Sequence, residues 1–125
     1  CDTGHNVDGI KYVCGHLDFL HQKFNQELHI VFGMVNDKDI SSVLQELPKY
    51  ATYYFTKASV KRALPENELL ALAEEAGLKG TTYPTVVEAV QAAKKNCPPK
   101  DLIFVGGSSF IVADLLANRD TLNLY

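Results

Sequence analysis

Short apolar runs alternate with longer segments of helical periodicity, and this alternation constrains the fold more than any other feature of the sequence. Residues 27–32, 51–55 and 102–105 have the β-branched and aromatic content and the flanking turn residues of buried strands, and residues 80–83 form a weaker candidate. Because helical segments separate these runs, the pattern predicts βαβ units. We therefore expect an α/β fold, a Rossmann-like three-layer αβα sandwich with a mainly parallel sheet.

The predicted helices carry their own start and stop signals. Apolar residues recur at helical spacing over residues 7–25, and a second helix begins near Ile40. Pro65 is expected as the first residue of a third helix, which stops at Gly77. A fourth helix is predicted from the capping box of residues 85–88, and a fifth would be capped by Ser108 or Ser109.

Length, charge and cysteine content exclude several classes of protein. The 125 residues fit one domain, and the net charge of −3 gives no basic surface for nucleic acid. Three cysteines without a CxxC pair indicate a reducing, cytoplasmic setting, with Cys14 expected in the core. No apolar run approaches the roughly 20 residues of a membrane span, and no signal peptide or zinc-ligand spacing occurs. Because the chain lacks an initiator Met, we expect a fragment of a longer protein.

Polar, glycine-rich segments follow the predicted strands, and they are where a ligand would bind. In open parallel sheets, ligands lie outside the carboxyl ends of the strands. Residues 33–39, 56–59 and 106–109 occupy such positions, and residues 2–6 join them if Cys1 ends a strand. Each segment precedes a helix or helical run, whose first N–H groups favour an anion. The pattern predicts a polar, anion-tolerant edge without naming the ligand.

Each of these segments also has an ordinary structural explanation. Residues 106–108 lack the Gly-Lys-Ser/Thr ending of a phosphate-binding loop, and they fit a tight turn with a serine cap. Asp37 and Lys38 fit a solvated helix start, and Lys57 fits a surface charge. His5 is either incidental beside an Asn6 cap or a contact to phosphate or nucleotide.

Together, three segments resemble one enzyme family. Residues 2–9, Asp-Thr-Gly-His-Asn-Val-Asp-Gly, are similar to the D-x-A-H-N-P-x-G motif of folylpolyglutamate and dihydrofolate synthases. Residues 32–39 resemble the G-x-x-x-D-K-D segment of that family, and residues 104–110 resemble its late G-S motif. The resemblance covers essentially the whole chain. Gly4 and Val7 depart from the motif, where Ala and Pro are usual.

The resemblance implies that residues 1–125 are the C-terminal, glutamate ligase domain of a Mur-type ligase, without the ATPase domain that precedes it. Such enzymes use ATP and magnesium to convert a carboxylate of folate or dihydropteroate to an acyl phosphate, which the amine of L-glutamate attacks. The phosphate loop and most magnesium ligands belong to the ATPase domain, so no metal site is expected in this chain. The isolated chain is expected to be inactive.

By this resemblance, the roles of the site residues divide between nucleotide and amino acid. Nucleotide binding falls to Asp2, His5 and Asn6, with Asp2 at the ribose and His5 also catalytic beside the reacting phosphate. The glutamate carboxylates are held by three residues, with Asp37 in support: Lys38, Ser108 and Ser109. A cell-wall Mur ligase and a non-catalytic Rossmann-like binding module are the alternatives.

Overall fold

The computed structural model describes residues 7–25, 27–35, 40–59, 61, 63–97, 101–106 and 116–117, with the backbone alone over residues 7–14. Helices and strands alternate along the chain in the order α1 (Val7–Phe24), β1 (Leu28–Phe32), α2 (Ile40–Glu46), β2 (Thr52–Phe55), α3 (Glu66–Glu75), β3 (Gly80–Thr82), α4 (Val86–Asn96) and β4 (Leu102–Gly106). The alternation read from the sequence is confirmed, including the short strand β3.

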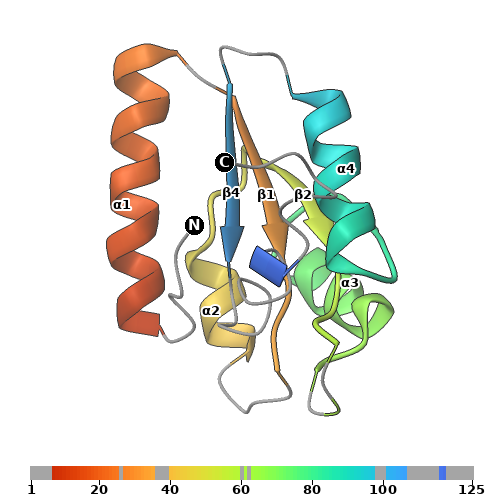
Figure 1. Ribbon diagram of the computed structural model, residues 1–125. Coiled ribbons are helices and arrows are strands. Elements are labelled where there is room, and N and C mark those ends of the chain that lie inside the picture. The colour runs from red at the N-terminus through yellow and green to blue at the C-terminus, as the bar shows by residue number, and fades with distance from the viewer. Residues whose placement is uncertain are drawn as a thin grey trace.

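The four strands of the described chain form one parallel sheet in the order β3-β2-β1-β4. Phe32 at the end of β1 is level with Phe55 of β2 on one side and with Gly106 of β4 on the other. Figure 1 shows the arrowheads of β1, β2 and β4 pointing toward the same end of the molecule. The predicted parallel sheet is therefore confirmed, and the carboxyl ends of its strands share one edge.

Helices cover both faces of the sheet, and side chains that alternate along each strand divide the core in two. On one face, Ile30 and Phe32 pack with α2, α3 and Leu17 of α1. On the other face, Val31 and Tyr54 pack against α4. The handedness of the connections explains this division. The connections through α2 and α3 run across the sheet from β1 to β2 to β3, whereas the connection through α4 runs in the opposite direction, from β3 to β4. Because such crossovers are right-handed, α4 lies on the opposite face from α2 and α3. The three-layer αβα architecture is thus confirmed.

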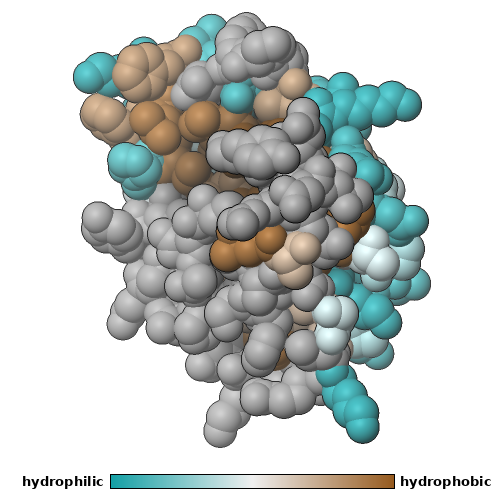
Figure 2. All heavy atoms as spheres, in the orientation of Figure 1, coloured by the Kyte–Doolittle hydropathy of each residue, from teal (hydrophilic) through white to brown (hydrophobic). Residues whose placement is uncertain are grey.

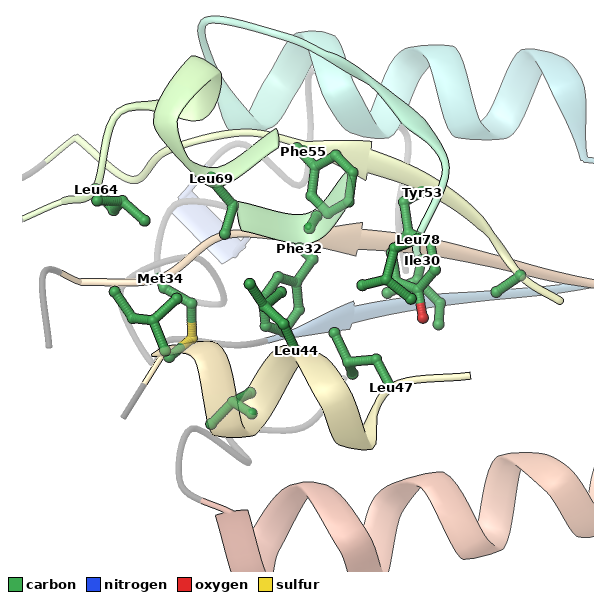
Figure 3. Close-up of a cluster of buried hydrophobic side chains, with 14 of the residues drawn as sticks. Ile30, Phe32, Met34, Leu44, Leu47, Tyr53, Phe55, Leu64, Leu69 and Leu78 are labelled. Atoms are coloured by element: carbon green, nitrogen blue, oxygen red, sulfur yellow. The ribbon is translucent and has the colours of Figure 1, made fainter. Parts of the chain in front are cut away.

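The larger of the two core clusters is the one that contains Ile30 and Phe32, and we call it the larger cluster. Phe32 and Phe55 are fully buried between the strands and the helices α2 and α3, where they meet Leu44 and Leu69 (Figure 3). Burying a side chain of this size stabilises the fold by about 1.5–3 kcal/mol. The carboxyl ends of β1 and β2 are consequently fixed in place just before their connecting segments begin.

The boundaries of α3 show one small difference from the sequence prediction. Pro65 is the residue before the helix, with an extended ψ of 140°, so it is not the first helical residue. Gly77 ends the helix with a φ of +85°, its N–H donates to Glu74, and the N–H of Leu78 donates to Ala73. This Schellman arrangement is the stop that Gly77 predicted.

The cap of α4 agrees with the prediction, whereas the fifth helix lies mostly outside the described residues. The Oγ1 atom of Thr85 accepts a hydrogen bond from the backbone N–H of Glu88 at 3.2 Å. Residues 116–117 are helical, and the predicted cap at Ser108 or Ser109 is outside the described part of the chain. The side chain of Cys14, expected in the core, is outside it as well.

None of the helices in the described ranges combines the length and the apolar character needed to cross a bilayer.

Candidate functional site

The carboxyl ends of the strands create the edge at which the sequence predicts a ligand. Residues 33–35 follow β1, residues 56–59 follow β2, and Gly106 ends β4. Because the strands are parallel and in register, these segments lie at one edge of the sheet, at the lower end of Figure 1. Figure 1 also shows α1 beginning at this end, so the chain enters α1 from the same side.

The strand order reverses between β1 and β4, and ligands of open α/β sheets bind at such a reversal. Moving from β1, the next strands in sequence lie on one side, whereas β4 lies on the other. The backbone N–H of Gly33 donates to the carbonyl oxygen of Gly106 across this point at 3.4 Å. The segments that leave β1 and β4 therefore start from neighbouring positions, and we call this place the switch point.

The site residues predicted from the sequence lie outside the described residues. Asp37 and Lys38 belong to the connection between β1 and α2, and Ser108 and Ser109 follow the end of β4. The described residues nearest to them at the switch point are Gly33 and Gly106. The nucleotide-binding residues were predicted just ahead of α1 and also fall outside the described part: Asp2, His5 and Asn6. Their roles stay predictions.

Hydrogen bonds tie the connection after β1 to the connection after β2. The N–H of Leu64 donates to the carbonyl oxygen of Met34 at 2.8 Å, and Val35 pairs with Ala63 in an antiparallel bridge. Met34 and Leu64 are both buried in the larger cluster. The chain on either side of residues 36–39 is thus anchored, at Val35 and at the buried Ile40.

Thr56 lies at this edge, and no individual role was predicted for it from the sequence. Its N–H donates to the carbonyl oxygen of Phe32 at 3.0 Å, which extends the ladder between β1 and β2 by one residue. Thr56 is 0% exposed, and within the described part of the chain its Oγ1 atom has no hydrogen-bond partner. Lys57, which follows it, is exposed as expected for a surface charge. The only sequence signal for Thr56 is a hydroxyl directly after a buried strand.

The amino end of the sheet contains a second polar group that the sequence did not predict. Nδ1 of His29 lies 2.9 Å from the hydroxyl of Tyr54, and both side chains are buried. Burial raises the pKa of the Tyr54 hydroxyl, and a hydrogen bond with Asn96 partly offsets that rise. His29 is a strand residue, as expected. His29 is in the first half of β1, and Tyr54 packs beneath α4. We therefore regard the hydrogen-bonded pair as part of the buried core.

Two exposed aromatic side chains of α1 lie far from the edge formed by the carboxyl ends of the strands. Phe19 and Phe24 of α1 are more than half exposed, and the Nζ atom of Lys23 lies 5.3 Å and 5.6 Å from their ring centroids. Figure 2 shows apolar atoms at the upper left, over the last turns of α1 and the start of β4. This surface is at the opposite end of the molecule from the switch point.

Magnesium ligands are not gathered in the described part of the chain. Within the described residues, no three His, Cys, Asp or Glu side chains come together to hold a metal ion. His16 is exposed on α1, and the ring of His21 stacks on Tyr50. Burial raises the pKa of the Cys97 thiol, which disfavours the thiolate that would bind a metal.

Curated relatives of this chain are folate ligases. It is 31% identical over 127 residues to the dihydrofolate synthase/folylpolyglutamate synthase of Buchnera aphidicola, covering 99% of this chain and 29% of that protein. It is 30% identical over 107 residues to the folylpolyglutamate synthase of Lacticaseibacillus casei, covering 84% of this chain and 23% of that protein. The chain thus spans less than a third of the length of these relatives.

A solved structure has the same architecture. FolC of E. coli, in complex with DHPP and ADP, superposes with a TM-score of 0.85 at 26% identity, covering 98% of this chain and 28% of that one. The family model of the Mur ligase glutamate ligase domain matches residues 1–109. The chain therefore belongs to the Mur ligase family, as a glutamate ligase domain of the kind found in folylpolyglutamate and dihydrofolate synthases.

Proposed function

We propose that this chain is the C-terminal domain of an ATP-dependent folate–glutamate ligase and that it presents L-glutamate and part of the nucleotide site to a separate ATPase domain. The observation that carries the proposal is the switch point between β1 and β4. There, Gly33 and Gly106 are hydrogen-bonded, and the segments that contain Lys38 and Ser108 depart from neighbouring positions.

The reaction explains why these residue types belong at this edge. The γ-phosphoryl group of ATP passes to a carboxylate oxygen of the folate substrate, and ADP leaves. The nitrogen of glutamate then attacks the acyl carbon, the bond to phosphate breaks, and the nitrogen loses a proton. The ammonium group of Lys38 and the hydroxyls of Ser108 and Ser109 would hold the glutamate carboxylates, with Asp37 orienting Lys38.

The nucleotide side of the site would be formed by the residues ahead of α1. A carboxylate such as Asp2 accepts hydrogen bonds from ribose hydroxyls, with Asn6 beside it, and His5 would lie near the transferring phosphoryl group. Magnesium, which offsets charge on that group when bound, is assigned with the phosphate loop to the ATPase domain. The isolated chain lacks a phosphate loop, so we expect no turnover without that domain.

The relatives favour the folate branch over the alternatives. A cell-wall Mur ligase would share the fold, but the curated matches to this chain are named for folate synthesis. The bifunctional name of the Buchnera protein favours a second activity, the synthesis of dihydrofolate from dihydropteroate. We place both reactions in the cytoplasm, where ATP and a reducing environment are available.

An acceptor panel in the complete ligase tests this function. ADP release is measured with L-glutamate and either a reduced folate, dihydropteroate or a nucleotide-linked muramoyl substrate. We expect glutamate-dependent turnover with the folate compounds. Turnover with the muramoyl substrate alone, or no dependence on glutamate, would overturn the proposal.

In the same assay, His5→Ala tests the nucleotide side of the site. Removing the imidazole is expected to lower kcat by roughly 100-fold or more, typical of a positioned group beside a reacting phosphate. His16→Ala is the control, because His16 is exposed on α1. Unchanged turnover in His5→Ala would remove His5 from the site.

A further inference from the structure

The outer edge of β4 is an open feature of the described sheet. Within the described chain, β4 pairs with β1 alone and ends the strand order β3-β2-β1-β4. The N–H of Leu102 donates to the carbonyl oxygen of Glu27, just before β1. Because successive residues of a strand direct their backbone groups to opposite sides, Ile103 and Val105 direct theirs away from β1. No described strand pairs with these groups.

The side chains of β4 are more exposed than is usual in a parallel sheet. The first three residues of β4, Leu102, Ile103 and Phe104, are partly exposed, whereas all five residues of β1 are buried. Strands of a parallel sheet are normally buried on both faces. Figure 2 shows apolar atoms over the start of β4 and the last turns of α1, where Phe24 is more than half exposed. An unpaired strand edge beside exposed apolar side chains is a template for a further strand.

The connection through α1 shows which strand fits this edge. Leu17 of α1 packs in the larger cluster with α2 and α3, so the three helices share one face of the sheet. The connections through α2 and α3 step from β1 toward β3. Because parallel crossovers are right-handed, a strand joined to β1 through α1 on that face steps in the same direction. It therefore lies on the β4 side of β1, and since β4 occupies the first position there, the free position is the outer edge of β4.

The direction of α1 agrees with such a strand. In Figure 1, α1 begins at the carboxyl end of the strands and runs opposite to β4. A strand that leads into α1 therefore ends at that edge, which makes it parallel to β4. The 18 residues of α1 span about 27 Å, more than the roughly 17 Å of the five-residue strand β4. The helix is thus long enough to return the chain to the start of β1.

We propose that the polypeptide segment that leads into α1 forms a strand parallel to β4 on the outer edge of β4. Its backbone pairs with Ile103 and Val105, and its apolar side chains cover the exposed part of β4. The occupant of this surface is a segment of the same polypeptide. The inference rests on the proposed function only in that a complete ligase supplies this segment, since the chain covers 29% of its Buchnera relative.

Residue-resolved amide hydrogen exchange in the complete ligase tests the pairing. We expect the amides of Ile103 and Val105 to exchange as slowly as the amide of Phe104, which faces β1 by the same alternation. An open edge would leave the Ile103 amide exchanging about 100-fold or more faster than that of Phe104, because it would exchange without local unfolding. That result would overturn the inference.

Proline substitutions identify the segment that covers the edge. Proline lacks the backbone N–H, and it is placed in turn at each of the roughly five or six positions, the usual length of a strand, that lead up to Cys1 in the complete ligase. We expect alternate positions to speed exchange at Ile103, because alternate residues of the new strand face β4. The amide of Tyr53, which donates to Lys79 on the other side of the sheet, is the control and should exchange as in the parent.

Slow exchange at Ile103 in every proline variant would show that another segment covers the edge, and it would overturn the inference. Failure of the proposed function is distinguishable, because hydrogen exchange requires no substrate. A ligase without glutamate-dependent turnover would contradict the function and leave the exchange at β4 unchanged.

Discussion

Gly80 and Gly15 show how differently two glycines of this chain tolerate a side chain. A Cβ atom at Gly80 would lie 2.4 Å from the backbone oxygen of Tyr53 and 2.7 Å from its Cβ. At Gly15, on the exposed face of α1, a Cβ atom would meet nothing within 4 Å. The close approach at Gly80 follows from the pairing of β2 with β3, in which Tyr53 is opposite Gly80.

For this reason, Gly80→Ala and Gly15→Ala should change stability in opposite directions. Gly80→Ala is expected to lower the free energy of unfolding by about 1–3 kcal/mol or more, because backbone atoms must move to make room. Gly15→Ala should raise it by about 0.5–1 kcal/mol, because alanine is the better residue in an exposed helix. Denaturant unfolding measures both, and a Gly80→Ala variant as stable as the parent would show that β3 does not pair as described.

Residue contacts of this kind are what the sequence predicted least well. The hydroxyl of Thr56, which is unpaired within the described chain, and the pairing of His29 with Tyr54 depend on the register between strands that are more than 20 positions apart. Periodicity shows that a residue belongs to a strand, but it does not show which residue faces it. Local signals were sufficient where the partners are close in sequence, as in the cap between Thr85 and Glu88.

The elements themselves were largely predictable, because each carries a local signal. The three main strands were expected within about a residue of their observed ends. The start of α3 differed by one residue, since Pro65 fits both the position before a helix and the first position within it. The strand order was not predictable, because two parallel strands can pair on either side of β1 without a change in periodicity. The switch point therefore emerged only from the structure.

At the scale of the element, α4 depends on its cap, and Thr85→Ala tests this. The variant removes the acceptor for the Glu88 N–H, so we expect the free energy of unfolding to fall by about 1 kcal/mol. Thr85→Ser keeps an acceptor and should remain close to the parent. If Thr85→Ala unfolds at the same denaturant concentration as the parent, the cap does not contribute to stability.

At the scale of the whole molecule, the carboxyl ends of the described strands share one edge, and the site predicted from the sequence belongs to that edge. The strand ends, the switch point, Thr56 and the start of α1 occur at that edge, whereas the exposed aromatic residues of α1 lie at the opposite end (Figures 1 and 2). We propose that this edge holds the amino acid and part of the nucleotide.

The substitution Lys38→Ala in the complete ligase tests the central claim most directly, because it removes the positive charge assigned to the glutamate carboxylate at the switch point. We predict that the KM for glutamate rises about tenfold or more while the KM for ATP is unchanged, since a charge-assisted hydrogen bond of about 1.5–3 kcal/mol is lost. Lys79→Ala, at an exposed position before β3, is the control and should match the parent. An unaltered glutamate KM in Lys38→Ala would contradict the assignment of the switch point as the glutamate site.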